Sequence, residues 1–486
     1  MKKYDLIVGL EIHFEPRTNS KMFCRCSADF WEKEPNTQTC PVCLGMPGAL
    51  PVLNGKAVEL AIKVGLALNC QIAEYTKFDR KHYFYPDLPK GYQISQYDKP
   101  ICYDGHLVIG PKTFRIQRIH MEEDVAKMIH ENDYSLIDFN KSGVPLFELV
   151  TYPEFRNGQD AYDFARRLRH IIREVGVSKA DMEKGQMRCE PNISVQEHGR
   201  YGYKDGKIWP IGDYKLNPKV EVKNIASISF IKKAIEYEYS RQVDILKNGG
   251  KLIQETRSWN NEKGITEHQR AKESAEDYRY LPDPDIPPLR ISRELVAKIR
   301  STLPILSDQR KKFYVEECGV RESTANAILE DIKFAKQFLK ITENLKASSV
   351  NIAANLALGT LKEYINENPN VKLDTTLLKS VFLALTDALN TEQINFNTAR
   401  EILKATLKNP KTNFEQLIKT STQTSNSSEL ENLINKVIAE NPKPVADYKS
   451  GKTAAIGAII GKIMQKTKGK ANARLVQELI VKILES

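Results

Sequence analysis

Short apolar runs alternate with polar residues, glycine and proline along residues 1–290, a pattern typical of strands joined by tight turns. Residues 4–14 and 221–228 predict strands on this basis. Residues 55–68 and 161–175 instead place apolar side chains about every 3.6 positions, which predicts amphipathic helices. The mixture predicts an α+β domain built on one large sheet system.

A proline-rich stretch at residues 281–289 ends this pattern, because successive prolines cannot continue a helix or a central strand. Helix formers dominate residues 292–407, and one predicted amphipathic helix has a face made by Ile328, Ile332, Ala335 and Leu339. A polar run that has nothing to bury then predicts a flexible linker. The predicted parts are a mixed-sheet domain (1–290), an all-α domain (291–419), the linker (420–428) and a small helical tail (429–486).

The composition is that of a globular protein, with 486 residues, 41% hydrophobic and 28% charged. No apolar run approaches the roughly 18 residues that a membrane span requires. The N-terminal residues are too charged for a signal peptide and lack the bias of a transit peptide. We therefore expect a cytoplasmic protein that does not associate with a membrane.

Positive charge is concentrated at the end of the chain. The formal net charge is +10, and residues 441–486 contain nine lysines and arginines against three acids. Such a concentration is typical of a surface that binds a phosphate backbone. A solvated, lysine-rich helical tail without a nucleic-acid partner would have the same composition.

Four of the eight cysteines lie within twenty residues, in the pattern C-x-C-x13-C-x2-C. Two close pairs of thiolates suit a tetrahedral Zn²⁺ with a structural role, and a disulfide is disfavoured in a reducing compartment. The alternative is a set of unligated thiols. The predicted zinc ligands are Cys24, Cys26, Cys40 and Cys43.

Acidic side chains recur in apolar surroundings. In the strand predicted at residues 4–14, the two-residue period places Glu11 and His13 on the same face. Glu148 is flanked by hydrophobic residues, where an unpaired carboxylate would be costly. Together these acids favour a Mg²⁺ site, whereas each acid taken singly is more often a salt-bridged or surface residue.

Basic and aromatic residues are interleaved at residues 77–93 and again at residues 277–280. Cations among aromatic rings can bind phosphate and stack a base. They can equally be amphipathic side chains packed along the edge of a domain.

Longer stretches of the chain resemble the GatB family, the B subunits of the glutamyl/aspartyl-tRNA amidotransferases. The resemblance runs from Tyr4 to the C-terminus. The stretches that carry it are residues 9–13, 80–96, 119–124, 140–146, 223–224, 255–257, 277–280 and 447–452.

The resemblance implies a cradle-like catalytic domain, a helical domain and a YqeY-like tail that binds tRNA. It also implies a glutamine-dependent amidotransferase, a ligase that forms carbon–nitrogen bonds on Glu-tRNA(Gln) or Asp-tRNA(Asn). The GatB-type subunit would phosphorylate the side-chain carboxylate with ATP. The amidase subunit (GatA) would release ammonia from glutamine, and a small third subunit (GatC) would complete the heterotrimer.

The same resemblance implies roles for individual residues. It implies that Lys81 takes part in ammonia passage and that Arg80 and Lys90 bind ATP. Where the family pattern R-C-D-x-N has aspartate, this chain has Glu190. The four-cysteine knuckle occurs only in some members of the family. The implied magnesium ligands are Glu11, His13, Glu123, Glu148 and Glu190. The first four, together with Lys81, are also implied to be catalytic.

Two alternatives accompany this assignment. One is a tRNA-binding scaffold subunit without catalytic activity, in which the acids are structural. The other is an archaeal-type GatE subunit specific for Glu-tRNA(Gln), which would carry an inserted domain that is not evident between Arg279 and Arg290.

Overall fold

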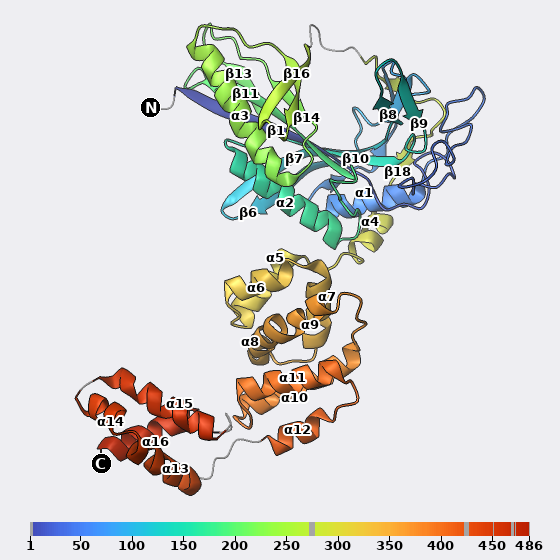
Figure 1. The fold of residues 1–486 in the computed structure, drawn as a ribbon. Helices are drawn as coiled ribbons and strands as arrows, with labels where there is room; N and C mark the ends of the chain where they lie inside the picture. The colour runs from blue at the N-terminus through green and yellow to red at the C-terminus, as the bar shows by residue number, and fades with distance from the viewer. Residues whose placement is uncertain are drawn as a thin grey trace. The chain divides into compact units, whose positions relative to one another are not determined.

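The computed structural model describes residues 3–271, 278–421, 427–450, 452–467, 471 and 473–485. The chain forms two compact units, residues 1–304 and 305–486 (Figure 1). No helix in the described part of the chain is both long and apolar enough to cross a lipid bilayer.

A nine-stranded sheet organises the first unit, in the order β16-β15-β14-β11-β1-β10-β7-β6-β2. Neighbouring strands are antiparallel except for the parallel pair β14–β15, so the sheet is mixed, as predicted. The strands are β1 (Tyr4–Phe14), β2 (Gln71–Ile72), β6 (Cys102–Ile109), β7 (Lys112–Glu123), β10 (Pro145–Thr151), β11 (Met187–Glu197), β14 (Val220–Lys223), β15 (Glu255–Asn260) and β16 (Ile265–Ala271).

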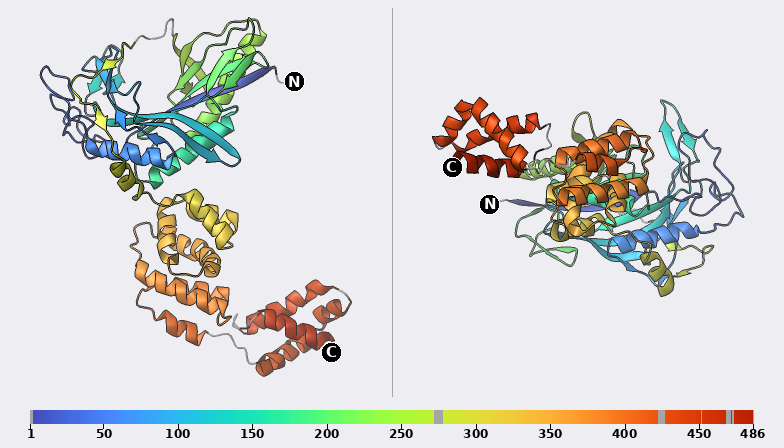
Figure 2. Two further views of the ribbon diagram at one scale, coloured as in Figure 1. Left: turned by 180° about the vertical axis from the view of Figure 1, so that it is seen from behind. Right: turned by 90° about the horizontal axis from the view of Figure 1, so that it is seen from below.

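Three helices cover one face of this sheet: α1 (Gly55–Ala67), α2 (Gly158–Glu174) and α3 (Ile228–Lys247) (Figures 1 and 2). The side chains of Asn54 and Asn157 cap the first turns of α1 and α2. Strand β1 turns Leu10, Ile12 and Phe14 toward this covered face, where they are fully buried. The intervening residues of β1 therefore lie on the opposite, open face.

Three two-stranded sheets and one three-stranded sheet complete the first unit. They are β12 (Tyr201–Lys204) with β13 (Lys207–Pro210), β8 (Lys127–His130) with β9 (Ser135–Asp138), β4 (Asp79–His82) with β5 (Tyr92–Ser95) and β17 (Leu281–Pro282), and β3 (Tyr75–Thr76) with β18 (Leu289–Arg290).

Two predicted features of the first unit differ from the structure. The strand expected at 221–228 ends at Lys223, because Asn224 adopts a left-handed backbone with a φ of 61° and helix α3 begins at Ile228. The predicted boundary at residue 290 is the second difference. Both ends of the proline-rich stretch are edge strands, β17 and β18, within the first unit, where the prediction also placed this stretch. Helix α4 (Arg293–Arg300) also packs on α1, and the division between the units follows Pro304.

The described part of the second unit is helical and contains two separate hydrophobic cores, within residues 314–418 and 430–484. The first core involves α6 (Glu322–Leu329), α7 (Ile332–Thr342), α8 (Ala347–Leu356), α9 (Lys362–Glu367), α10 (Thr375–Asn390), α11 (Phe396–Lys408), α12 (Phe414–Thr420) and the π-helical turns Phe313–Glu317 and Ala357–Leu361, and α5 (Ser307–Lys312) precedes these elements. The second involves α13 (Ser427–Glu440), α14 (Pro442–Lys449), α15 (Ile456–Lys466) and α16 (Ala473–Glu485), and the 3₁₀ turn Thr453–Ala455 lies between α14 and α15 in the sequence.

The single helix predicted through Ile328 and Leu339 is wrong. Helix α6 ends at Leu329, and the side chain of Asp331 caps the new helix α7 by accepting hydrogen bonds from two backbone N–H groups. Because α7 is a separate helix, its buried face does not continue that of α6. Leu339 is exposed, and Phe338 is buried instead. In the predicted linker, residues 422–426 lie outside the described part of the chain.

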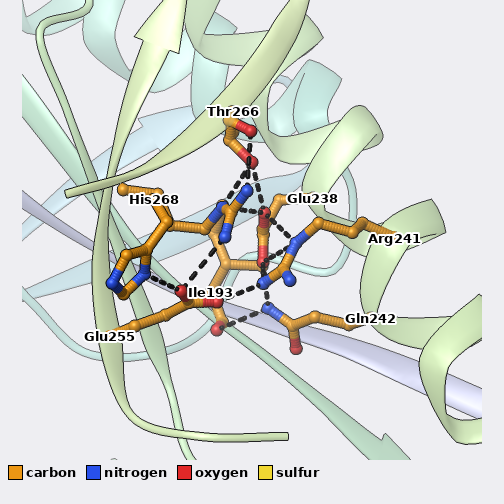
Figure 3. Close-up of polar contacts among 8 residues, drawn as sticks. Ile193, Glu238, Arg241, Gln242, Glu255, Thr266 and His268 are labelled. Atoms are coloured by element: carbon orange, nitrogen blue, oxygen red, sulfur yellow. Dashed lines mark hydrogen bonds and ion pairs between the residues drawn. The ribbon is translucent and has the colours of Figure 1, made fainter. Parts of the chain in front are cut away.

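A buried ionic network joins α3 to β15 and to the edge strand β16 (Figure 3). Glu238 is fully buried, and its carboxylate accepts hydrogen bonds from Arg241 at 2.6 Å and from Thr266 at 2.9 Å. Glu255 on β15 pairs with Arg241 at 2.8 Å and with Arg257 at 3.0 Å. Removal of one member of such a buried group leaves the opposite charge uncompensated.

We predict that Glu238→Gln lowers the free energy of unfolding of the first unit by about 3 kcal/mol. Urea unfolding, followed by tryptophan fluorescence, measures this change. The matched control is Glu236→Gln on the same helix, because Glu236 is exposed and its carboxylate forms a surface pair with Lys232 at 3.9 Å. Equal stability of the two variants would contradict the prediction.

Candidate functional site

A row of ionisable side chains crosses the open face of the sheet. His13 on β1 lies opposite Glu148 on β10, and Glu148 lies opposite His120 on β7. Both imidazole Nε2 atoms lie 3.3 Å from Glu148 Oε2, and His13 Nε2 also lies 3.6 Å from Glu122 Oε1. His13, Glu122 and Glu148 can therefore direct three ligand atoms to one point, since these atoms lie within 4.8 Å of one another.

A β-bulge brings β7 into this row. Val150 and Thr151 on β10 pair with Arg118 and Ile116, so Gln117 is the extra residue on β7. Side chains along β7 alternate between the two faces of the sheet, and the extra residue shifts this alternation by one. His120 and Glu122 therefore lie on the open face.

The charges in the row stabilise one another. Burial would lower the pKa of His13, but Glu148 and the nearby acids outweigh burial and raise it to about 9. Burial would raise the pKa of Glu148, but His120 and His13 hold it well below its usual value. The Nδ1 atoms of both histidines are buried without a hydrogen-bond partner among the described residues. A divalent cation would take the place of the His13 proton at this site, since the two neighbouring carboxylates offer oxygen ligands and the neutral imidazole offers nitrogen.

A second acidic cluster lies further along the same face. Glu11 on β1, Glu190 on β11 and Glu221 on β14 place one carboxylate oxygen each within 4.8 Å of the others. Lys223 Nζ lies 3.1 Å from Glu190 and 3.3 Å from Glu221. Burial, together with Glu148, raises the pKa of Glu11. Lys219 also acts on Glu11, and three carboxylates with two lysines still leave excess negative charge that suits a second divalent cation.

A cavity of about 360 Å³ adjoins the second cluster. Its lining includes the apolar residues Val150, Ile208 and Leu216 and the polar residues Glu11, Asn217 and Lys219. An apolar floor with a few convergent polar groups is typical of a site that binds an organic ligand.

The structure separates Glu123 from the other implied magnesium ligands. Its side chain lies toward β5, where it accepts the Ile94 N–H at 3.0 Å and forms an ion pair with Lys90. Glu122, which was not singled out from the sequence, takes the position beside His13 and Glu148. The two-residue period of the stretch His120-Met121-Glu122 could have indicated this arrangement, whereas nothing in the sequence around Glu221 placed it beside Glu11.

The two implied ATP-binding cations already have carboxylate partners. Arg80 Nε donates to Asp283 at 2.8 Å, and its guanidinium lies 4.3 Å from the centre of the Tyr92 ring. Lys90, with its partner Glu123, lines a cavity of about 250 Å³ beside the cysteine cluster.

Lys81 is surrounded by aromatic rings. Its Nζ lies 4.7 Å from the centre of the Tyr278 ring and 5.7 Å from that of Tyr83. Lys81 forms no ion pair with any of the residues that the structure describes. In the motif at 277–280, Asp277 lies outside the described residues.

The four cysteines converge as predicted. Cys24, Cys26, Cys40 and Cys43 hold their sulfur atoms within 4.8 Å of one another, and Cys40 Sγ lies 3.9 Å from Cys43 Sγ. Four sulfurs at 2.3 Å from a tetrahedral Zn²⁺ would be about 3.8 Å apart, so the arrangement fits that ion. A hydrogen bond from Cys24 and the positive charge of Lys21 lower the pKa of Cys43. Such a shift favours the thiolate that binds a metal.

Two family models match the chain. Residues 6–297 match the GatB/GatE catalytic domain, and residues 336–484 match the GatB domain. Similar curated proteins align with this chain over nearly its whole length. One from Caldanaerobacter subterraneus subsp. tengcongensis is 42% identical over 98% of both chains. One from Persephonella marina is 43% identical over 99% of this chain and 100% of its own.

Both of these relatives are named as B subunits of an aspartyl/glutamyl-tRNA(Asn/Gln) amidotransferase. The two family models and the identities of above 40% over almost complete chains lead to one conclusion: the chain belongs to the GatB family.

Proposed function

We propose that this chain is the component of a tRNA-dependent amidotransferase that activates the misacylated amino acid. The substrates are Glu-tRNA(Gln), Asp-tRNA(Asn) or both, which the complex converts to Gln-tRNA(Gln) and Asn-tRNA(Asn) in the cytoplasm. Full-length similarity to the B subunits of such enzymes supports the reaction. The observation that carries the assignment of a catalytic role is the pair of acidic clusters on one open face of the sheet.

The chemistry requires activation because a carboxylate is a poor electrophile. A side-chain carboxylate oxygen of the misacylated residue attacks the γ-phosphorus of ATP and expels ADP, which forms an acyl phosphate. Ammonia then attacks the acyl carbon, loses a proton and expels inorganic phosphate, which leaves the amide. The ammonia comes from glutamine hydrolysis in GatA, the amidase of a heterotrimer that also contains the small protein GatC.

The residues on the open face fit a role in phosphoryl transfer. His13, Glu122 and Glu148 would hold one Mg²⁺, and Glu11, Glu190 and Glu221 would hold another. Bound Mg²⁺ would neutralise charge on the phosphates of ATP. Lys223 holds Glu190 and Glu221 in place, and the side-chain amide of Asn192 does the same for Glu11 at 3.0 Å.

ATP has a candidate site next to these ligands. The cavity lined by Val150, Ile208 and Leu216 would offer apolar surface for a base, and Glu11 brings the second acidic cluster to its edge. The assignment of Arg80 and Lys90 to ATP stays a prediction, and both would have to leave a carboxylate partner to contact phosphate.

The four cysteines are proposed to bind a structural Zn²⁺. Their segment is tied to the loop at residues 138–143, which leads into β10: Gln38 N–H donates to Asn140 at 2.6 Å, and the Ser142 hydroxyl donates to the carbonyl of Cys43 at 3.1 Å. Zinc would therefore stabilise the loop that precedes Glu148.

Glu148→Gln is expected to lower tRNA-dependent ATP cleavage by roughly 100-fold, because glutamine keeps the shape but removes the charge that pairs with two histidines. The glutaminase activity of GatA should change little. The measurement is release of ADP by the reconstituted complex with Glu-tRNA(Gln), with exposed Glu262→Gln as the control. Undiminished ATP cleavage would favour a scaffold role without catalytic activity.

Lys81→Ala is expected to uncouple glutamine hydrolysis from amide formation. If Lys81 takes part in ammonia passage, glutamine-dependent synthesis falls while synthesis from added ammonium salt is spared. Parallel assays of Gln-tRNA(Gln) formation with the two nitrogen donors distinguish the roles. Equal loss with both donors would indicate that Lys81 contacts phosphate.

Removal of the chain after Ser428 is expected to raise the KM for aminoacyl-tRNA, because the basic tail is proposed to bind the tRNA backbone. The hydrophobic core of residues 430–484 is separate from that of residues 314–418, so the remaining chain keeps its cores. The log–log salt slope of tRNA binding should flatten by about one unit per lost phosphate contact.

The control for the truncation keeps the fold of the tail and removes only charge, as in the double variant Lys443→Gln/Lys449→Gln. Both of these lysines are exposed on α14. An unchanged salt slope in the truncated protein would refute the tRNA role.

A further inference from the structure

A fully buried lysine lies against the cysteine cluster. The side chain of Lys21 is among the largest with no exposed surface. Its Nζ donates to Cys43 Sγ at 3.5 Å and to the backbone carbonyl of Phe139 at 3.3 Å. Among the residues that the structure describes, no carboxylate forms an ion pair with Lys21.

A buried ammonium without an opposite charge is strongly destabilising. Carboxylates compensate the other buried or largely buried lysines of this region, as Glu123 does for Lys90 and Asp124 for Lys141. For Lys21 the available acceptors are a neutral carbonyl and a sulfur atom. The compensating negative charge must therefore reside on the sulfur cluster.

Thiolates supply that charge, and a bound metal holds all four cysteines in that form. Four neutral thiols carry none, whereas four thiolates around one Zn²⁺ carry a net charge of −2. One ammonium in hydrogen-bond contact with a ligand sulfur offsets half of this charge. It also gives Cys43 Sγ a donor that holds the ligand in position, as partners of metal ligands commonly do.

We propose that Lys21 is the counter-charge of the four-cysteine site and that it retains the metal by stabilising the thiolate of Cys43. This inference rests on the zinc site proposed above and adds a residue outside the cysteine motif. The second hydrogen bond of Lys21, to Phe139, extends the site to the loop that precedes β10. Met22 N–H, which donates to the carbonyl of Gly143 at 2.8 Å, reinforces the same connection.

The test measures zinc in the full-length protein, first by elemental analysis and then by the rate of transfer to an excess of a chromogenic chelator at constant pH. Lys21→Met removes the charge and nearly preserves the volume. We expect it to release zinc at least ten times faster than the wild type. The matched control is Lys33→Met, since Lys33 is exposed in the same cysteine-containing segment. It should release zinc at the wild-type rate.

The outcomes separate the two proposals. Absence of zinc from freshly purified wild-type protein, equal to that of Cys40→Ser, would refute the zinc site itself. Zinc in the wild type with the same release rate from Lys21→Met and Lys33→Met would overturn the role of Lys21 and leave the zinc site intact.

A measurement on the wild type covers the case in which Lys21→Met does not fold. Lysine acetylation, quantified by peptide mass spectrometry, is compared before and after zinc removal. We expect acetylation of Lys21 to rise at least ten-fold when the metal is removed, while that of Lys33 is unchanged. Equal protection of Lys21 with and without zinc would overturn the proposal.

Discussion

The candidate active site depends on the pairing register of four adjacent strands, β11, β1, β10 and β7. This register places His13 opposite Glu148, and Glu148 opposite His120. A shift of one residue in any strand would turn its polar set toward the three covering helices. The bulge at Gln117 makes the arrangement possible on β7, because it keeps Ile116 on the covered face and still turns His120 and Glu122 to the open one.

The same arrangement concentrates charge at a cost in stability. Two clusters of three ligands lie on one face, and the second contains carboxylates alone. Histidines offset the charge of Glu148, and Lys223 offsets part of the charge of Glu190 and Glu221. This balance suits a face that binds divalent cations together with a phosphorylated ligand. The cations bring positive charge to the carboxylates, and the phosphates bring negative charge to the cations and to the basic side chains. The cysteine segment supports the face from one side through the loop before β10.

Much of the fold was predictable, because local patterns determine it. Strand β1 spans the predicted residues, and the spacing of the cysteines indicated their convergence. The errors arise where a single residue changes the local backbone, as Asn224 does at the end of β14 and Asp331 does at the start of α7. Glu221 and Lys21 could not be assigned from the sequence, because their partners lie on strands or loops that only the fold brings together. Glu122 was missed because the register, rather than its type, distinguishes it from Glu123.

Anomalous diffraction from crystals of the complex, grown with Mn²⁺ and a non-hydrolysable ATP analogue, tests the central claim most directly. Mn²⁺ takes the oxygen and nitrogen ligands that Mg²⁺ uses and is visible by its anomalous signal. The account predicts one peak between His13, Glu122 and Glu148 and one between Glu11, Glu190 and Glu221, with the analogue in the adjoining cavity. Peaks beside Lys90 and Glu123 instead, or no Mn²⁺ on this face of the sheet, would contradict it.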